Sequence, residues 1–328
     1  GGAPLERFAE YSAIAEVHGA SWLDWPPGLR RPGTFEVRAF AEEHARRVRF
    51  HAWMQWQLDR QLAAAGDAIG LVQDLAIGAD RGGADAWMWQ DLLALDMSVG
   101  APPDDFNPSG QDWGLPPYDP WRLRGACYEP FVETVRAGFR HAAGLRVDHV
   151  MGLFRLYWIP RGATGSEGVY VRYPAGDLLD ILALESVRAG ACVVGEDLGT
   201  VEDEVRRELG RRGVLSYRLA WFEPSPPRDF PRQALAAITT HDLPTVAGLW
   251  TGADLAAQRQ RGMEADDAAT ASLRDRARDL AGVADDAPVA QVAARLHERL
   301  AEAPSMIVTA TLEDALGVEE RPNYPGTT

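Results

Sequence analysis

Residues 144–152 read GLRVDHVMG, a short stretch in which an Arg and an Asp precede a histidine and, soon after, a glycine. Arg146 and Asp148 occupy alternate positions in it, so in an extended strand both side chains point to the same side. Charged groups on the inner side of a parallel strand are costly unless they are paired or hydrated. We therefore expect a strand that ends at a functional carboxylate, Asp148, with Arg146 beside it.

The composition is that of a globular chain without a nucleic-acid partner. The 328 residues, 46% of them hydrophobic, suffice for one large core or two ordinary domains. A formal net charge of −15 opposes binding to a phosphate backbone. Two cysteines, Cys127 and Cys192, cannot form a disulfide framework for a chain of this length. No window of the sequence resembles a membrane span or a signal peptide. We expect a soluble, cytoplasmic protein with no membrane partner.

Short apolar runs alternate with helical patterns along the chain. Six of these runs read as strands, near residues 69, 145, 191, 214, 236 and 306. This alternation predicts a parallel sheet, either open or closed into a barrel. No glycine-rich phosphate loop follows any of the strands, which favours a (β/α)8 barrel over a doubly wound open sheet.

Two regions of the sequence have a helical pattern. Residues 253–303 are rich in alanine and arginine and read as helical throughout. The helical pattern over residues 35–65 contains Trp53 and Trp56. Because large aromatic side chains mostly fill cores, we expect both tryptophans to be packing residues.

Three of the predicted strands end in a carboxylate, at Asp148, Glu196 and Asp242. In a (β/α)8 barrel the carboxyl ends of all strands face one rim, so these side chains can converge. A pair of carboxylates is what a retaining glycosidase needs, one to attack the anomeric carbon and one to protonate the departing oxygen. Arg146 supplies a positive charge for an attacking Asp148, and Glu196, which adjoins Asp197, is the candidate proton donor.

Other interpretations of the strand ends stay open at this point. Asp242, with His241 before it, could grip sugar hydroxyls, or the carboxylates could be ordinary caps and ion pairs. A metal site formed by the carboxylates with His149 and His241 is a further alternative. The chain contains no H-x-x-x-H or C-x-x-C spacing that would favour metal binding.

Residues 99–121 form a long stretch without a regular pattern. A loop of about 20 residues in a compact domain is usually a lid, a binding loop or disordered. This one contains Phe106, Trp113, Tyr118 and Trp121, whereas disordered tracts are poor in aromatic residues. We expect an ordered binding loop whose aromatic faces can stack on sugar rings.

Several segments resemble the signature motifs of the 4-α-glucanotransferases, the amylomaltases of glycoside hydrolase family 77. The segments are RVDH at 146–149, GEDLG at 195–199, THDLP at 240–244, QD at 73–74, GQDWGLP at 110–116 and RPNYPGT at 321–327. They run from about residue 70 to the end in the family's order. The resemblance implies a (β/α)8 barrel of the α-amylase type, with residues 253–303 as a helical insertion and residues 99–121 as the loop that covers the glucan.

The resemblance also implies an activity and roles for single residues. The activity is transfer of α-1,4-glucan segments between maltooligosaccharides with retention of configuration, with glucose or maltose as acceptor and no metal or organic cofactor. Asp148 would be the nucleophile, Glu196 the general acid/base and Asp242 the stabiliser of the transition state. Residues that would contact the substrate are Arg146, His241, Asp74, Gln111, Trp113, Phe106, Asp104 and Asn323. The alternatives are an α-glucan hydrolase of the same class and an inactive, truncated glucan-binding remnant.

The number of predicted strands differs from that of a complete barrel. We find six candidates, whereas a complete barrel has eight strands. The first two strands of the family's barrel are expected upstream of residue 1. We therefore expect residues 1–328 to be a fragment of the catalytic barrel that lacks part of the sugar site and exposes strand edges.

Overall fold

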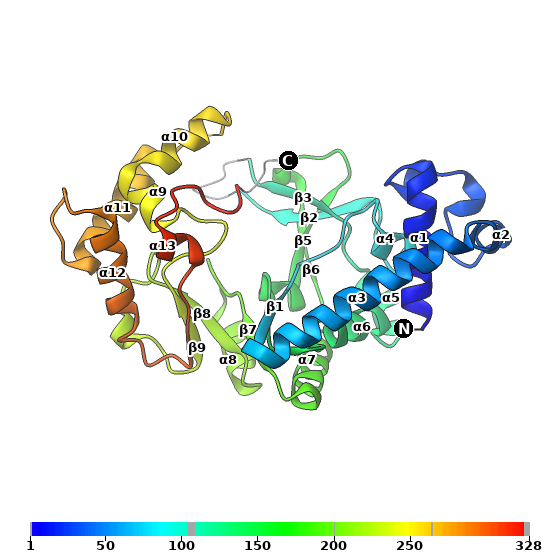
Figure 1. Cartoon of the computed structure of the whole chain (residues 1–328), viewed down its shortest axis with the longest axis horizontal. Helices are drawn as coiled ribbons and strands as arrows, with labels where there is room; N and C mark the ends of the chain where they lie inside the picture. Colours follow the sequence, from blue (N-terminus) through cyan, green and yellow to red (C-terminus); the bar gives the residue numbers. More distant parts are fainter. Residues whose placement is uncertain (1, 104–108, 200, 264, 325–328) are drawn as a thin grey trace. The chain divides into compact units, whose positions relative to one another are not determined.

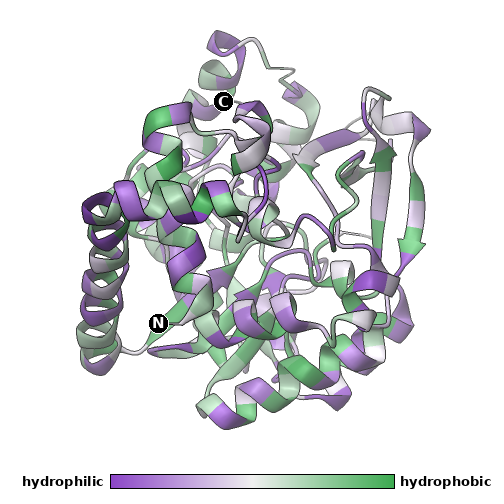
Figure 2. Cartoon of the chain, turned by 90° about the vertical axis from the view of Figure 1, so that its right-hand side faces the viewer, coloured by the Kyte–Doolittle hydropathy of each residue, from purple (hydrophilic) through white to green (hydrophobic). Residues whose placement is uncertain are grey.

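The computed structural model describes residues 2–103, 109–199, 201–263 and 265–324 (Figure 1). The chain forms two compact units, Gly1–Val193 and Val194–Thr328. The boundary falls inside a strand, β7 (Cys192–Gly195), so one half of this strand belongs to each unit. Figure 2 shows hydrophobic and hydrophilic residues along the same helical ribbons, as expected of helices that pack on one face.

The first unit begins with a helical layer. Its elements are α1 (Ala3–His18), the short 3-10 turns η1 (Trp22–Asp24) and η2 (Pro27–Leu29), α2 (Phe35–Glu43), α3 (Ala45–Ile69) and α4 (Ala84–Trp89). The rings of Tyr11, Trp25 and Trp87 pack against one another in tilted and edge-on arrangements within its core. Their polar atoms are satisfied inside the cluster, since the indole of Trp87 donates to the Leu29 carbonyl at 3.0 Å and that of Trp25 to the Gly19 carbonyl at 2.8 Å.

Helix α3 differs from the predicted packing. No side chain of the described helix is fully buried, and Trp53 and Trp56 are 50% and 48% exposed. The prediction that these two tryptophans fill the core is therefore wrong. Hydrophobic spacing identifies a helix, but it does not reveal whether another element covers the apolar side.

Parallel strands β1 (Leu71–Leu75) and β4 (Ala142–Val147) follow in the same unit. Their register places Asp74 opposite Arg146. Gly144 allows β7 to approach β4 closely, because a Cβ there would lie 2.8 Å from the Cys192 sulfur. The same unit contains α5 (Pro120–Gly125), α6 (Glu129–Phe139) and α7 (Ala175–Ala189), of which α6 packs against both strands and against α7.

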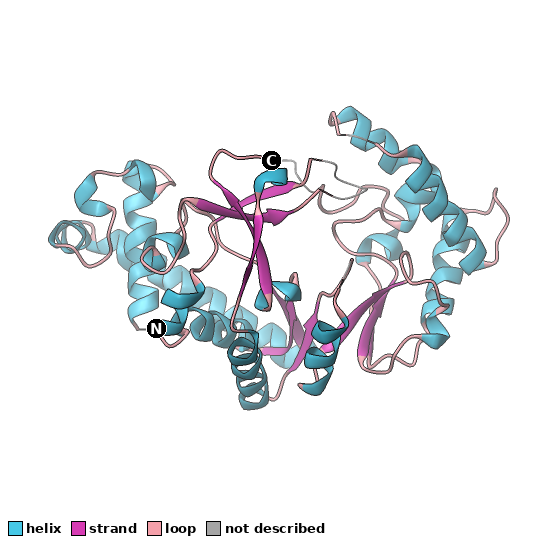
Figure 3. Ribbon diagram, turned by 180° about the vertical axis from the view of Figure 1, so that it is seen from behind, coloured by secondary structure: helices cyan, strands magenta, loops and turns pink. Residues whose placement is uncertain are grey.

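A second, antiparallel sheet was missed in the sequence (Figure 3). Its order is β3-β2-β5-β6, formed by Gln111–Leu115, Met97–Ala101, Arg155–Pro160 and Val169–Arg172. The expectation of an irregular stretch over residues 99–121 is therefore wrong for β2 and β3. Gly100 is required at their pairing, since a Cβ there would lie 1.9 Å from the Gln111 carbonyl oxygen. Two more 3-10 turns, η3 (Val150–Leu153) and η4 (Gly165–Glu167), flank β5.

The parallel strands of the second unit are β8 (Leu215–Leu219), β9 (Ala234–Ala237) and β10 (Ile307–Val308). Its other elements are α8 (Asp203–Arg211), η5 (Pro227–Asp229), α9 (Val246–Thr251), α10 (Ala253–Gln260), α11 (Asp267–Ala281), α12 (Val289–Leu300) and α13 (Leu312–Leu316). Helices α10, α11 and α12 occupy the region that was predicted to be helical, residues 253–303. That this region is an insertion into a barrel stays a prediction.

All six predicted strands are present, and their hydrogen-bonded order is β1-β4-β7-β8-β9-β10. Helices follow strands along the chain, and the pairs β1–β4, β7–β8, β8–β9 and β9–β10 are parallel. The predicted fold class, an incomplete (β/α) barrel, is confirmed. Within the described ranges, no helix combines the length and apolar character that crossing a membrane requires.

The difference in exposure between the tryptophans predicts losses of stability of different size. Trp87 is fully buried, so Trp87→Ala should lower the free energy of unfolding by about 3–5 kcal/mol. Trp53→Ala, the matched control on α3, should cost less than about 1 kcal/mol. Urea unfolding of both variants followed by circular dichroism tests this expectation, and equal losses would contradict the described packing.

Candidate active site

A single guanidinium joins two carboxylates at the ends of β1 and β4. Nη1 of Arg146 donates to both oxygens of Asp74, at 2.7 and 2.9 Å, and Nη2 donates to Oδ1 of Asp148 at 2.9 Å. The arginine side chain is only 15% exposed, whereas those of Asp74 and Asp148 are 51% and 33% exposed. The sequence therefore predicted correctly that Arg146 lies beside Asp148, and the partly buried cation fixes the orientation of an accessible carboxylate.

The backbone around Asp148 ends the strand at this point. The Asp148 amide donates to the Leu75 carbonyl at 3.0 Å, which is the last link between β4 and β1. His149 then adopts a left-handed conformation with φ of 43°, and η3 follows directly. A non-glycine residue in this region is uncommon and often marks a functional turn. The turn leaves the Asp148 side chain at the strand's end.

His149 lies against the aromatic residue of β3. Its ring meets that of Trp113 edge-on, with centroids 5.5 Å apart and an interplanar angle of 76°. The indole of Trp113 donates to the Gln111 side-chain oxygen at 3.1 Å, so Gln111 and Trp113 share one side of the strand. Burial lowers the pKa of His149, and the nearby charge of Asp148 opposes this effect only in part. The imidazole is therefore neutral at neutral pH.

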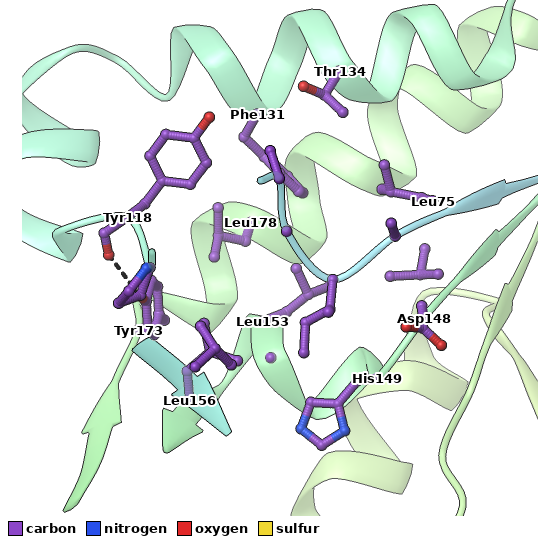
Figure 4. Close-up of a pocket in the computed structure, with 18 of the residues that line it drawn as sticks. Leu75, Tyr118, Phe131, Thr134, Asp148, His149, Leu153, Leu156, Tyr173 and Leu178 are labelled. Atoms are coloured by element: carbon purple, nitrogen blue, oxygen red, sulfur yellow. Dashed lines mark hydrogen bonds between the residues drawn. The ribbon is translucent and has the colours of Figure 1, made fainter. Parts of the chain in front are cut away.

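A cavity of about 260 Å³ opens beside Asp148 and His149 (Figure 4). Its wall is mostly aliphatic, with Leu75, Leu153, Leu156 and Leu178 among the labelled lining residues. Tyr173 donates to the Tyr118 carbonyl at 2.6 Å, and burial raises the pKa of both phenols, so neither carries charge. This volume lies just below the range of about 300–1,000 Å³ that is usual for ligand pockets. Scattered leucines gave no sequence signal for this cavity.

In the second unit, Glu196 follows directly after β7. Its Oε1 accepts a hydrogen bond from the Leu198 amide at 2.7 Å. The neighbouring Asp197 is buried and accepts from the Ser216 hydroxyl at 2.6 Å and the Tyr217 amide at 2.8 Å. Asp197 therefore ties the segment that carries Glu196 to β8.

Asp242 lies after β9 with two predicted site residues around it. Nε2 of His241 is 3.3 Å from Oδ2 of Asp242, and Nδ2 of Asn323 donates to Oδ1 of the same carboxylate at 2.5 Å. Asn323 was predicted to contact substrate, and the structure places it on Asp242. The side chains of His241 and Asp242 are 48% and 40% exposed, so the pair is accessible to a ligand.

The predicted residues thus fall into two groups. The first unit holds Asp74, Gln111, Trp113, Arg146 and Asp148, and the second holds Glu196, His241, Asp242 and Asn323. Asp104 and Phe106 lie outside the described residues. Among the residues that the structure describes, no three His, Cys, Asp or Glu side chains are grouped so as to hold a metal ion.

The fold and the site define an α/β protein of the barrel type with carboxylates at the ends of its parallel strands. The family model described as 4-alpha-glucanotransferase matches residues 1–328. The chain belongs to the 4-alpha-glucanotransferase family, which confirms the resemblance of its motifs.

Curated relatives agree with this assignment. A 4-alpha-glucanotransferase from Mycobacterium tuberculosis is 42% identical over an alignment that covers 100% of this chain and 49% of the relative. A 4-alpha-glucanotransferase from Haemophilus influenzae is 40% identical, with 79% of this chain and 38% of the relative covered. The chain therefore spans about half the length of the mycobacterial relatives that it matches.

Two solved structures of amylomaltases are similar to this chain. The crystal structure of amylomaltase from Corynebacterium glutamicum matches with a TM-score of 0.84 at 36% identity, over 100% of this chain and 49% of that one. Amylomaltase from Streptococcus agalactiae, solved in complex with acarbose, matches with a TM-score of 0.80 at 19% identity, over 98% and 66%. The second match supports the fold alone.

The lowered pKa of His149 predicts a pH-dependent stability. Its pKa in the folded chain lies below the ordinary value of 6.5. At a pH below 6.5 the unfolded chain therefore binds more protons at His149 than the folded chain does. The free energy of unfolding should therefore decrease from pH 6.5 downward and reach its full value above it.

Replacement of this imidazole should flatten the profile. We expect His149→Asn to show a smaller difference in unfolding free energy between pH 8 and pH 5 than the parent chain, measured by urea denaturation. Since both side chains are neutral at pH 8, that value is the reference for any loss of packing. An unchanged difference would show that His149 does not titrate as described.

Proposed function

We propose that the full-length protein containing this chain is a 4-α-glucanotransferase. It transfers α-1,4-glucan segments from a maltooligosaccharide donor to a maltooligosaccharide, maltose or glucose acceptor, with retention of configuration. The observation that carries the proposal is the Arg146 bridge to Asp148 at the end of β4, within a chain whose family model matches throughout. Two free cysteines, Cys127 and Cys192, support a cytoplasmic location.

The reaction has two displacements, and Asp148 takes part in both. In the first, its carboxylate attacks the anomeric carbon, the bond from that carbon to the leaving glucan oxygen breaks, and Glu196 gives its proton to that oxygen. In the second, the 4-hydroxyl of the acceptor attacks the same carbon, its proton passes to Glu196, and the ester to Asp148 breaks. Two inversions at one carbon give net retention.

The described contacts suggest how Asp148 is prepared for attack. Arg146 engages Oδ1 through its Nη2 atom, and we assign the attack to Oδ2. The cation holds the carboxylate in one orientation, so less rotational freedom is lost when the donor binds. Asp74, on the other side of the same guanidinium, is exposed enough to accept hydrogen bonds from sugar hydroxyls.

The remaining predicted residues are assigned supporting roles. We assign Asp242 to the hydroxyls of the reacting sugar, with His241 beside it and Asn323 on its Oδ1. Gln111 and Trp113 would line the donor site from β3, and Asp104 and Phe106 would extend it in the loop over residues 99–121. Leucines around the cavity beside Asp148 would limit the access of water to the glycosyl ester, which favours transfer over hydrolysis.

Incubation of the full-length protein with maltotriose tests the activity. Transfer yields longer oligosaccharides together with glucose or maltose, whereas hydrolysis yields only shorter products. Products that are exclusively shorter would replace the proposal with an α-glucan hydrolase. Binding of maltooligosaccharides without any turnover would indicate a glucan-binding remnant.

The assignment of Asp148 as the nucleophile predicts a large loss of activity when its carboxylate is removed. Asp148→Ala should reduce the rate of maltotriose disproportionation by at least about 10³-fold, because the covalent route is lost. The matched control is Asp285→Ala, which removes an exposed carboxylate paired with Arg278 in the second unit and should retain the rate within about twofold. A rate for Asp148→Ala within about tenfold of the parent protein would exclude Asp148 as the nucleophile.

A further inference from the structure

The segment around Arg321 closes onto the dipeptide His241–Asp242. Nη1 of Arg321 donates to the Asp242 carbonyl at 3.0 Å, and the Asn323 amide donates to the His241 carbonyl at 3.1 Å. With the Asn323 side chain on Oδ1 of Asp242, three hydrogen bonds converge on two consecutive residues. They fix both peptide carbonyls as well as one carboxylate oxygen.

Arg321 is itself held by a buried carboxylate. Its Nε donates to Oδ1 of Asp254 at 2.6 Å, and its Nη2 donates to Oδ2 of the same residue. The side chains of Arg321 and Asp254 are 8% and 1% exposed, and Gln258 donates to Asp254 Oδ2 at 2.7 Å. A buried ion pair is retained at low cost only where hydrogen bonds satisfy it, and the planar guanidinium fork then has a fixed direction. The remaining Nη1 group points at Asp242.

The chain before this segment is tied down independently. The Thr245 hydroxyl donates to the Val318 carbonyl at 2.8 Å, and the Val246 amide donates to Oδ1 of Asp314 at 2.7 Å. Gly248 permits the close approach, since a Cβ there would lie 2.2 Å from the Glu319 carbonyl oxygen. Residues 314–323 are therefore anchored to the beginning of α9, a few residues after Asp242.

We propose that Arg321 and Asp254 are positioning residues for Asp242. Asp254 sets the direction of the Arg321 guanidinium, Arg321 fixes the Asp242 peptide, and Asn323 fixes one oxygen of its carboxylate. Neither Arg321 nor Asp254 contacts the sugar. The inference rests on the proposed function, because it requires that Asp242 stabilises the transition state.

Correct positioning of Asp242 should affect kcat more than KM. A contact that is strongest in the transition state raises kcat, whereas uniform binding changes KM. A misplacement of about 1 Å can cost about 10²-fold in rate. We expect Arg321→Ala in the full-length protein to lower kcat for maltotriose disproportionation by about 10²-fold, with KM within about twofold of the parent value.

Three comparisons separate positioning from a purely structural role. Millimolar guanidinium should restore part of kcat to Arg321→Ala and have no such effect on the parent protein. Arg321→Lys keeps the charge but loses the fork, so its kcat should stay low. The control Arg261→Ala changes an arginine that pairs with Glu320 and stacks on Tyr324, and it should leave kcat within about twofold.

Asp254→Asn provides the test if Arg321→Ala does not fold. It is nearly isosteric and should lower kcat by about tenfold at unchanged KM, with circular dichroism confirming the fold. An active parent protein whose folded Arg321→Ala and Asp254→Asn variants keep its kcat would overturn this inference alone. A parent protein that neither lengthens nor shortens maltotriose would overturn the proposed function, and this inference with it.

Discussion

The arrangement of the first unit depends on one guanidinium shared between two carboxylates. Arg146 bonds to Asp74 across the strand pair and to Asp148 two residues along its own strand. This requires the register in which Asp74 lies opposite Arg146, because a slip of one residue would turn every side chain to the other face. The ion pairs of Arg146 therefore depend on the register of β1 and β4, and they fix the orientation of Asp148. The hydrogen bond from the Asp148 amide to the Leu75 carbonyl ends the pairing of the two strands at the same point.

Much of the parallel sheet could be predicted from sequence. Each of its strands is a short apolar run, and three of them are followed by Asp148, Glu196 or the His241–Asp242 pair. These signals are local, so a single sequence contains them. The bond between Arg146 and Asp148 was also predictable, since alternate residues of a strand share a side.

Other features depend on contacts between distant residues. The sheet formed by β2, β3, β5 and β6 was missed because its short strands are recognisable only through their partners. Trp53 and Trp56 were misassigned because hydrophobic spacing does not show what covers a helix. Asn323 lies 81 residues from Asp242 along the chain, so its bond to that carboxylate had no local signal. The RPNYPGT motif at residues 321–327 identified Asn323 as a candidate site residue, but the motif does not show which residue Asn323 contacts.

The central assignment is that Asp148 forms the covalent bond to the glucan, and trapping this bond tests it most directly. The full-length protein with Glu196→Gln would be treated with a fluorinated maltosyl fluoride, which forms the glycosyl ester but releases it slowly, and then digested for mass spectrometry. We expect one glycosyl group on the peptide that contains Asp148, attached to the side chain of that residue. A glycosyl group on Asp74 or Asp242, or release of fluoride without any labelled peptide, would contradict it.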